Sequence, residues 1–368
     1  MKQLLQAGLL ALAILPAAAH AQVPAGYPAD YAATIAAARV EGKVVVYSVL
    51  SNAAAAPLVN DFRALYPGIE VAYDGERGST EMADGYASDI AQGKDSADVV
   101  WSSAMDLQMR FVDLGYAASY RSPEAPHLPA WANYRDQAWG TTFEPIAFVY
   151  NKELVQGDEI PRDHAAFARL LASRPDKFKG KVTTFDIDKS GVGFMFAVAD
   201  SQQSAAMPEL LGALGAAGVR PSAGTGIMLT KINSGEFLLG YHLMGAYAMA
   251  RAKKDLPHLG VVLPSDYTLV LSRVMFISRH ARHPNAARLW ADYLLSKRGQ
   301  KVLGDALELF TVRSDVEARY TAAALLRQLG ASARPIPLSP SLASYLGAEQ
   351  HAAFLARWNA AVAAGRAQ

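Results

Sequence analysis

The chain of 368 residues carries 35 Lys and Arg residues against 34 Asp and Glu residues, and it contains no cysteine. This near-neutral balance excludes a global basic field that would attract nucleic acid, so any charge selectivity must be local. Stability must come from a hydrophobic core rather than from disulfides, and the length suggests roughly two domains.

The first 21 residues are typical of a secretory signal peptide. Lys2 precedes an apolar run, and Ala19-His20-Ala21 forms an A-x-A cleavage pattern. The run of about a dozen apolar residues is too short to span a bilayer. The absence of cysteine at the cleavage site excludes a lipid anchor there. We therefore expect a soluble periplasmic protein whose mature chain begins at Gln22.

Strands and helices alternate through the first part of the mature chain. Apolar and β-branched runs predict strands over 43–50, 69–74 and 97–103. Helical periodicity predicts a short helix over 31–41 and longer ones over 52–68, 79–93 and 104–115. This order is typical of an open, mainly parallel α/β sheet.

A second α/β set follows a strand over 140–154 that crosses the predicted domain boundary. It comprises strands over 180–186 and 237–243 and two strands within 260–278, with helices over 163–174, after 188–193, over 206–217 and near 226–234. Further helices are predicted over 284–297, 299–306, 314–329 and 348–363, and residues 334–341 are predicted to form a proline-rich surface loop.

Small polar residues follow four of the predicted strands. Ligands bind beyond the carboxyl ends of parallel strands, where helix N-termini present unpaired N–H groups and a partial positive charge. These ends predict a shared anion site, whose candidate residues are Ser51, Arg77, Gly78, Ser79, Ser103, Ser190 and Gly191. In the alternative interpretation, each hydroxyl only caps its helix.

The turn Arg77-Gly78-Ser79-Thr80 is the strongest of these candidates. Gly78 allows a close approach of the backbone, the two hydroxyls cap the helix and offer donors, and Arg77 adds a planar cation suited to an oxyanion. The alternative is that Arg77 pairs with Glu76 or Glu81 on the surface.

Two further candidates lie near the domain boundary and in the second domain. Glu144 is placed at the first crossover between the domains, where it either contacts the ligand or serves as a hinge residue. Tyr241 follows Gly240 at a predicted strand end and is a candidate ligand contact.

Motifs of the common catalytic classes are missing from the sequence. There is no Walker loop, no G-x-S-x-G elbow, no S-x-x-K and no H-E-x-x-H. His280 and His283 lie three residues apart, but no third metal ligand is identified for them. We therefore expect a protein that is not an enzyme and that has no cofactor or metal site.

The order of segments resembles the extracellular solute-binding proteins of ABC importers, particularly the cluster of ferric-iron, phosphonate, phosphoglycerate and sugar-phosphate binders. The segments that carry the resemblance cover about residues 40–312 and are KVVVYSVL, FRALYPGIEV, SADVVWSS, FEPIAFVYNKEL, GKVTTFDIDKSGVGF, SGEFLLGYHL and PNAARLWADYLLSKRGQKVL. The resemblance implies a type II periplasmic-binding-protein fold, in which two α/β lobes joined by two crossover strands close on a ligand. Lobe 1 would comprise residues 22–142 and 270–368, and lobe 2 residues 143–269.

The same resemblance implies a monomeric periplasmic protein that delivers a small anionic solute, an organophosphate, phosphonate or carboxylate, to an inner-membrane permease. Ferric binders of this cluster carry adjacent tyrosines, whereas Tyr241 and Tyr247 are separated here. Two alternatives stay open, a ferric-iron binder and a periplasmic ligand sensor for a membrane kinase.

Overall fold

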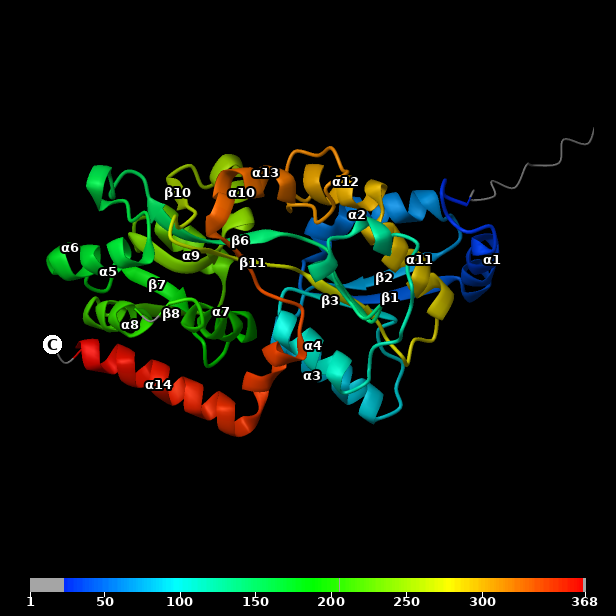
Figure 1. Cartoon of the computed structure of the whole chain (residues 1–368), viewed down its shortest axis with the longest axis horizontal. Helices are drawn as coiled ribbons and strands as arrows, with labels where there is room; N and C mark the ends of the chain where they lie inside the picture. Colours follow the sequence, from blue (N-terminus) through cyan, green and yellow to red (C-terminus); the bar gives the residue numbers. More distant parts are fainter. Residues whose placement is uncertain (1–22, 205, 367–368) are drawn as a thin grey trace, which may run out of the picture.

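Two α/β lobes make up the protein in a computed structural model that describes residues 23–204 and 206–366 (Figure 1). The predicted signal peptide, residues 1–21, lies outside the described residues. None of the helices in the described ranges combines the length and the apolar composition that a membrane span requires.

Lobe 1 contains a six-stranded sheet in the order β2-β1-β3-β12-β5-β4. Its strands are β1 (Lys43–Ser48), β2 (Glu70–Asp74), β3 (Val99–Ser102), β4 (Asn133–Tyr134), β5 (Ala138–Gly140) and β12 (Val274–Ile277). The lobe also holds the helices α1 (Tyr31–Glu41), α2 (Asn52–Leu65), α3 (Ser79–Ala91), α4 (Met105–Asp113), α11 (Pro284–Leu295) and α12 (Lys297–Asp305). Because β1, β2 and β3 run parallel, α2, α3 and α4 all begin at the same edge of the sheet.

Lobe 2 contains a seven-stranded sheet in the order β13-β11-β6-β9-β7-β8, with β10 paired to β6. Its strands are β6 (Glu144–Asn151), β7 (Val182–Phe185), β8 (Arg220–Ser222), β9 (Leu239–Met244), β10 (Leu259–Val262), β11 (Thr268–Leu271) and β13 (Ala333–Pro335). The helices α5 (His164–Ser173), α6 (Pro175–Phe178), α7 (Gly191–Ser201), α8 (Met207–Ala216), α9 (Thr225–Asn233) and α10 (Gly245–Lys254) surround it.

The connection between the lobes is formed by paired strands. The chain enters lobe 2 through β6 and returns to lobe 1 between β11 and β12, and Leu271 of β11 is in register with Glu144 of β6. Residues 260–278, predicted to hold two strands, hold three, because Ser272 and Arg273 separate β11 from β12. A third passage runs from Thr311 through α13 (Ala322–Leu329) to β13. The helix predicted over 314–329 begins only at Ala322, because the Thr321 side chain caps it there.

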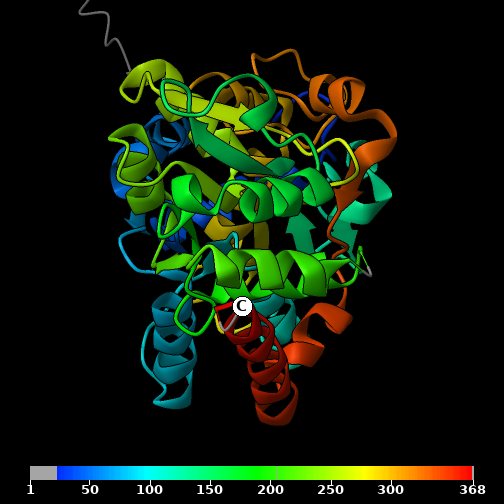
Figure 2. The ribbon, with the colours of Figure 1, turned by 90° about the vertical axis from the view of Figure 1, so that its left-hand side faces the viewer.

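The C-terminal segment differs from the prediction that residues 270–368 belong to lobe 1. Strand β13 pairs with β11, and α14 (Ala348–Arg366) packs along α8, on the outside of lobe 2 (Figure 2). The contact is backbone to backbone, since a Cβ added at Gly215 would lie 1.9 Å from the Val362 carbonyl oxygen. The chain therefore returns to lobe 2 after α12 and α13.

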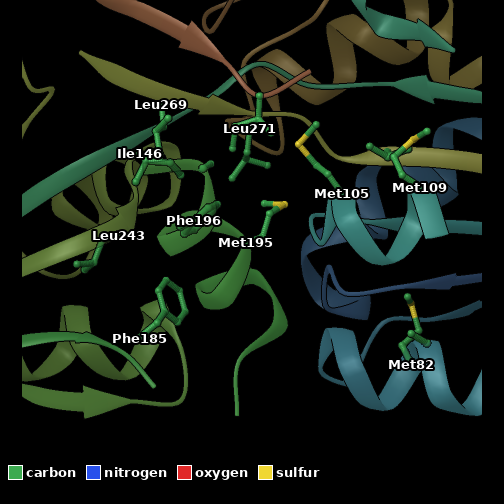
Figure 3. Close-up of a cluster of buried hydrophobic side chains, with 14 of the residues drawn as sticks. Met82, Met105, Met109, Ile146, Phe185, Met195, Phe196, Leu243, Leu269 and Leu271 are labelled. Atoms are coloured by element: carbon green, nitrogen blue, oxygen red, sulfur yellow. The ribbon is translucent and has the colours of Figure 1, made fainter. Parts of the chain in front are cut away.

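An apolar cluster joins the lobes. It includes Met105 of α4, Met195 of α7 and Leu271 beside the crossover, whose side chains point into the same region (Figure 3). Ile336 and Leu338 also belong to this cluster and are buried. The segment 334–341 is therefore only in part the surface loop that its prolines suggest: residues 334, 335, 337 and 341 are exposed, whereas Ile336 and Leu338 are buried.

Candidate ligand-binding site

The first turns of α3 in lobe 1 and α7 in lobe 2 lie against one another. A Cβ added at Gly191 would lie 3.2 Å from Thr80 Oγ1 and 3.5 Å from Ser79 Oγ. An alanine at position 191 would require the Thr80 side chain to give way by a few tenths of an ångström, so glycine favours this close approach. The structure thus brings Ser79 and Thr80 together with Ser190 and Gly191, although these pairs are more than a hundred residues apart in the sequence.

The start of α7 is held by local hydrogen bonds. Ser190 is the N-cap residue, and its hydroxyl accepts a hydrogen bond from the Gly193 amide at 3.2 Å. Gly193 packs on the end of β7, where a Cβ would lie only 2.4 Å from Phe185 Cβ. The Gly193 amide is thus satisfied by Ser190, and the amides of Gly191 and Val192 are the ones left without an intrahelical partner in this turn.

The two hydroxyls at the start of α3, which were predicted to cap this helix, do not occupy its N-cap position. Gly78 occupies the N-cap position and the helix begins at Ser79, so neither Ser79 nor Thr80 is the N-cap residue. Gly78 has φ −67°, and a Cβ there would meet no protein atom within 4 Å, so the backbone itself does not require glycine. Both hydroxyls remain available as donors toward α7, and Glu81 in the same turn is exposed.

The N-terminus of α2 is already occupied by groups of the protein. Glu76 Oε1 accepts a hydrogen bond from the Asn52 amide at 2.9 Å, and Ser51 Oγ accepts one from the Ala54 amide at 3.3 Å. A carboxylate thus stands where an anion would bind. Ser51, one of the predicted site residues, serves as the exposed N-cap of this helix.

The N-terminus of α4 is occupied in a similar way. Asp106 Oδ1 accepts a hydrogen bond from the Leu107 amide at 2.9 Å, inside the first turn. Ser103, another predicted site residue, is buried just before this turn, and its carbonyl accepts a hydrogen bond from the Met105 amide. Within the described chain, no carboxylate accepts a hydrogen bond from the first turn of α3 or α7. Of the four helix N-termini that were predicted to bind an anion, only those of α3 and α7 therefore remain candidates.

Arg77 points toward its own lobe. Its guanidinium forms an ion pair of 2.8 Å with Asp74 and lies 4.3 Å from the centre of the Tyr47 ring. The partner is thus Asp74 and neither Glu76 nor Glu81. The Nε atom of Arg77 is buried and has no hydrogen-bond partner within the described residues. Contact between Arg77 and a ligand would require the guanidinium to exchange Asp74 for the ligand.

Glu144 lies in the connection between the lobes and is fully buried. Arg273 holds its carboxylate through Nε at 2.9 Å and Nη2 at 3.4 Å. The Thr142 hydroxyl donates to Glu144 at 2.8 Å and accepts a hydrogen bond from the Arg273 amide. This bidentate pair ties the two crossover strands together, as the hinge interpretation of Glu144 expects. Sequence reasoning missed Arg273, whose position between two apolar strands is the only signal for it.

Tyr241 is fully buried inside lobe 2 rather than at a strand end. Its hydroxyl and that of Tyr267 both donate hydrogen bonds to Asp200 of α7, which His242 also contacts at 2.8 Å. Burial and the negative charge of Asp200 raise the pKa of Tyr241 well above its usual value. The network anchors the far end of α7 to β9. No group of three or more His, Cys, Asp or Glu residues in the described ranges is arranged to hold a metal ion.

The comparisons with known proteins match this architecture. Residues 57–327 match the family model of the bacterial extracellular solute-binding proteins. The substrate-binding protein of an ABC transporter from Agrobacterium tumefaciens is 35% identical, with a TM-score of 0.82, and the match covers 87% of this chain and 94% of that chain. A comparison with the curated proteins finds no significant match. The chain therefore belongs to the bacterial extracellular solute-binding proteins, as the resemblance of its segments predicted.

More distant structures share the fold. The periplasmic binding protein AfuA from Actinobacillus pleuropneumoniae, with fructose-6-phosphate bound, is 18% identical with a TM-score of 0.70, and the match covers 87% of this chain and 98% of that chain. Iron-bound HitA from Pseudomonas aeruginosa is 16% identical with a TM-score of 0.67, covering 87% and 99%. The predicted two-lobed periplasmic-binding-protein fold is thereby confirmed, and at these identities the likeness extends to the fold alone.

Proposed function

We propose that this protein is the periplasmic component of an ABC importer and that it binds a small oxyanionic solute between the first turns of α3 and α7. Membership in the solute-binding family supports transport, and the related protein from Agrobacterium tumefaciens is described as the substrate-binding protein of an ABC transporter. The protein would carry the solute to an inner-membrane permease without transforming it.

The meeting of two helix N-termini is the observation that favours an anionic ligand. Two helix N-termini from different lobes meet at Thr80 and Gly191, while the neighbouring starts of α2 and α4 already hold carboxylates of the protein. Unpaired N–H groups and aligned helix dipoles favour negative charge, and hydroxyls add donors. A phosphate, phosphonate or carboxylate group held there would contact both lobes and favour their closed arrangement. AfuA, with its bound sugar phosphate, is a fold relative consistent with this class of ligand.

A ferric-ion cargo has less support. The hydroxyls of Tyr241 and Tyr267 are both used as donors to Asp200 inside lobe 2. To bind iron as a phenolate, Tyr241 would have to be deprotonated, but the pKa of its hydroxyl is raised well above the usual value. Iron loading followed by visible absorption is a direct check, since phenolate–iron bonds are coloured.

Calorimetric titration with inorganic phosphate, simple organophosphates, phosphonates and carboxylates tests the proposal. Ser79→Ala and Thr80→Ala should each weaken the binding of the best ligand about tenfold, as expected for loss of one charge-assisted hydrogen bond. Ser51→Ala, which removes the cap of α2, serves as the matched control and should leave affinity unchanged. Absence of binding by every oxyanion, or equal affinity in all three variants, would refute the proposed site.

A further inference from the structure

The C-terminal segment crosses from lobe 2 to lobe 1 and back. Strand β13 lies against β11, and the Ile336 amide donates a hydrogen bond of 2.8 Å to the Val270 carbonyl. The next element, the 3₁₀ helix η5 (Pro340–Leu346), packs against α4 of lobe 1. The chain then enters α14, which packs along α8 of lobe 2 (Figure 1). Residues 339–346, the bridging segment, are thus the part of the C-terminal chain that reaches α4.

The chain that leads into the bridging segment is fixed in shape by its own sequence. Ile336 and Leu338 are buried, whereas the prolines that precede each of them are exposed, and this alternation fits an extended chain. Proline restricts φ, so less conformational entropy is lost when such a chain is held extended. Ser339 then caps η5, because its hydroxyl accepts a hydrogen bond from the Ser341 amide at 3.2 Å. Docking of this segment therefore costs little conformational entropy.

The helix that follows the bridging segment is fixed firmly to lobe 2. Phe354, Trp358 and Val362, spaced at helical intervals along α14, are buried against the core of this lobe. Phe194 of α7 also contacts α14, since its ring centre lies 4.3 Å from that of His351 and 5.3 Å from that of Phe354. Helix α14 is therefore expected to move together with α7 and the rest of lobe 2 when the lobes change their arrangement.

The contact of the bridging segment with lobe 1 is weaker. Leu342 of η5 is partly buried and packs against the interlobe cluster, to which α4 contributes Met105 and Met109 (Figure 3). Tyr345 and Leu346 of the same helix pack against the core of lobe 2 instead. Within the described chain, no hydrogen bond or ion pair joins residues 339–346 to α4. Separation of the lobes would thus break an apolar contact between η5 and α4, while α14 stays on lobe 2.

We propose that the bridging segment is a latch that holds the two lobes together in the ligand-free protein. Its apolar contact with lobe 1 exists only while the lobes are closed, so the free energy of that burial favours the closed arrangement over the open one. The first turn of α7, with Gly191, is thereby held against α3 before any solute arrives. The latch acts on the lobes themselves and does not depend on which solute the protein binds.

Spin labels on the two lobes measure this effect in the ligand-free protein. Because the chain has no cysteine, Asp84→Cys in α3 and Glu209→Cys in α8, both at exposed positions, introduce two unique labelling sites. Double electron–electron resonance then gives the distribution of distances between the lobes. With the latch intact, one short distance should dominate. Leu342→Ala should raise the ratio of open to closed protein about fivefold, as expected for the loss of a partly buried leucine side chain, and Leu342→Asp should raise it further.

Leu346→Ala is the matched control, because it removes the same side chain from the same helix at a position that packs on lobe 2. It should leave the distance distribution unchanged. Leu342→Met keeps an apolar side chain of similar volume and should stay closed, and thermal melts report the folding of each variant. Three results would overturn the inference: a ligand-free wild-type protein that is already mainly open, an open population no larger in Leu342→Ala and Leu342→Asp than in wild type, or an equal shift in Leu346→Ala.

Discussion

Gly191 of α7 lies so close to Thr80 of α3 that a Cβ on the glycine would come within 3.2 Å of the threonine hydroxyl. These residues belong to different lobes, and each stands in the first turn of a helix. Their contact therefore brings together two helix ends that carry partial positive charge. The proposed anion site rests on this relationship, and the following substitutions test it.

Gly191→Ala should weaken anion binding by about tenfold or more, because the added methyl group would crowd the Thr80 and Ser79 hydroxyls and displace them as donors to the anion. Titration of the variant with the best oxyanion measures the effect. Gly212→Ala, in α8, is the matched control, since a Cβ there meets nothing within 4 Å. Equal affinities of the two variants would show that the contact between α3 and α7 is not part of the site.

Arg77 and Asp74 should have opposite effects on affinity if Arg77 binds the solute. Arg77→Ala should weaken binding about tenfold. Asp74→Asn should strengthen it, because it frees a guanidinium that is otherwise paired at 2.8 Å. Both variants should change the free energy of unfolding by less than about 1 kcal/mol, since the pair is partly exposed. A loss of stability in Arg77→Ala without any change in affinity would assign this residue a structural role only.

Glu144→Gln should lower the free energy of unfolding by about 3–5 kcal/mol, because it leaves the Arg273 guanidinium buried without a counter-charge. The double variant Glu144→Gln with Arg273→Met should recover most of that loss. Urea unfolding of the single and double variants measures both values as a double-mutant cycle. Additive effects of the two substitutions would contradict a coupled pair across the crossover strands.

Asp106 should make the ligand-free protein less stable as the pH rises from about 4 to about 7. Its pKa is raised to about 7 in the folded protein, against about 3.9 in an unfolded chain. Between these values the folded state keeps a proton that the unfolded state has lost. The free energy of unfolding therefore falls with rising pH, by at most about 1.4 kcal/mol per pH unit, and levels off above pH 7.

Comparison with Asp106→Asn isolates this contribution from those of other carboxylates. The difference in the free energy of unfolding between the two proteins should grow in favour of the variant across that pH range. A constant difference would show that the pKa of Asp106 is not raised in the folded protein.

The sequence by itself determined the alternation of strands and helices and the turns that carry the polar residues. These features depend on hydrophobic periodicity and on glycine, serine and proline signals within a few residues, and most predicted elements are present within a few residues of their predicted bounds. Placement of Ser79 and Ser190 at helix starts follows from the same local signals. The resemblance of segments in their order predicted the two-lobed fold.

Only the tertiary structure decided which helix starts remain open to an anion. Glu76 reaches the start of α2 across 24 residues of sequence, and Arg273 reaches Glu144 across 129. Such contacts depend on the packing of whole elements, and no local pattern encodes them. The return of α14 to lobe 2 is decided in the same way, by the close backbone contact of Gly215 with Val362. Periodicity predicts that a helix forms, whereas the surface it buries depends on shape and charge brought together by the rest of the chain.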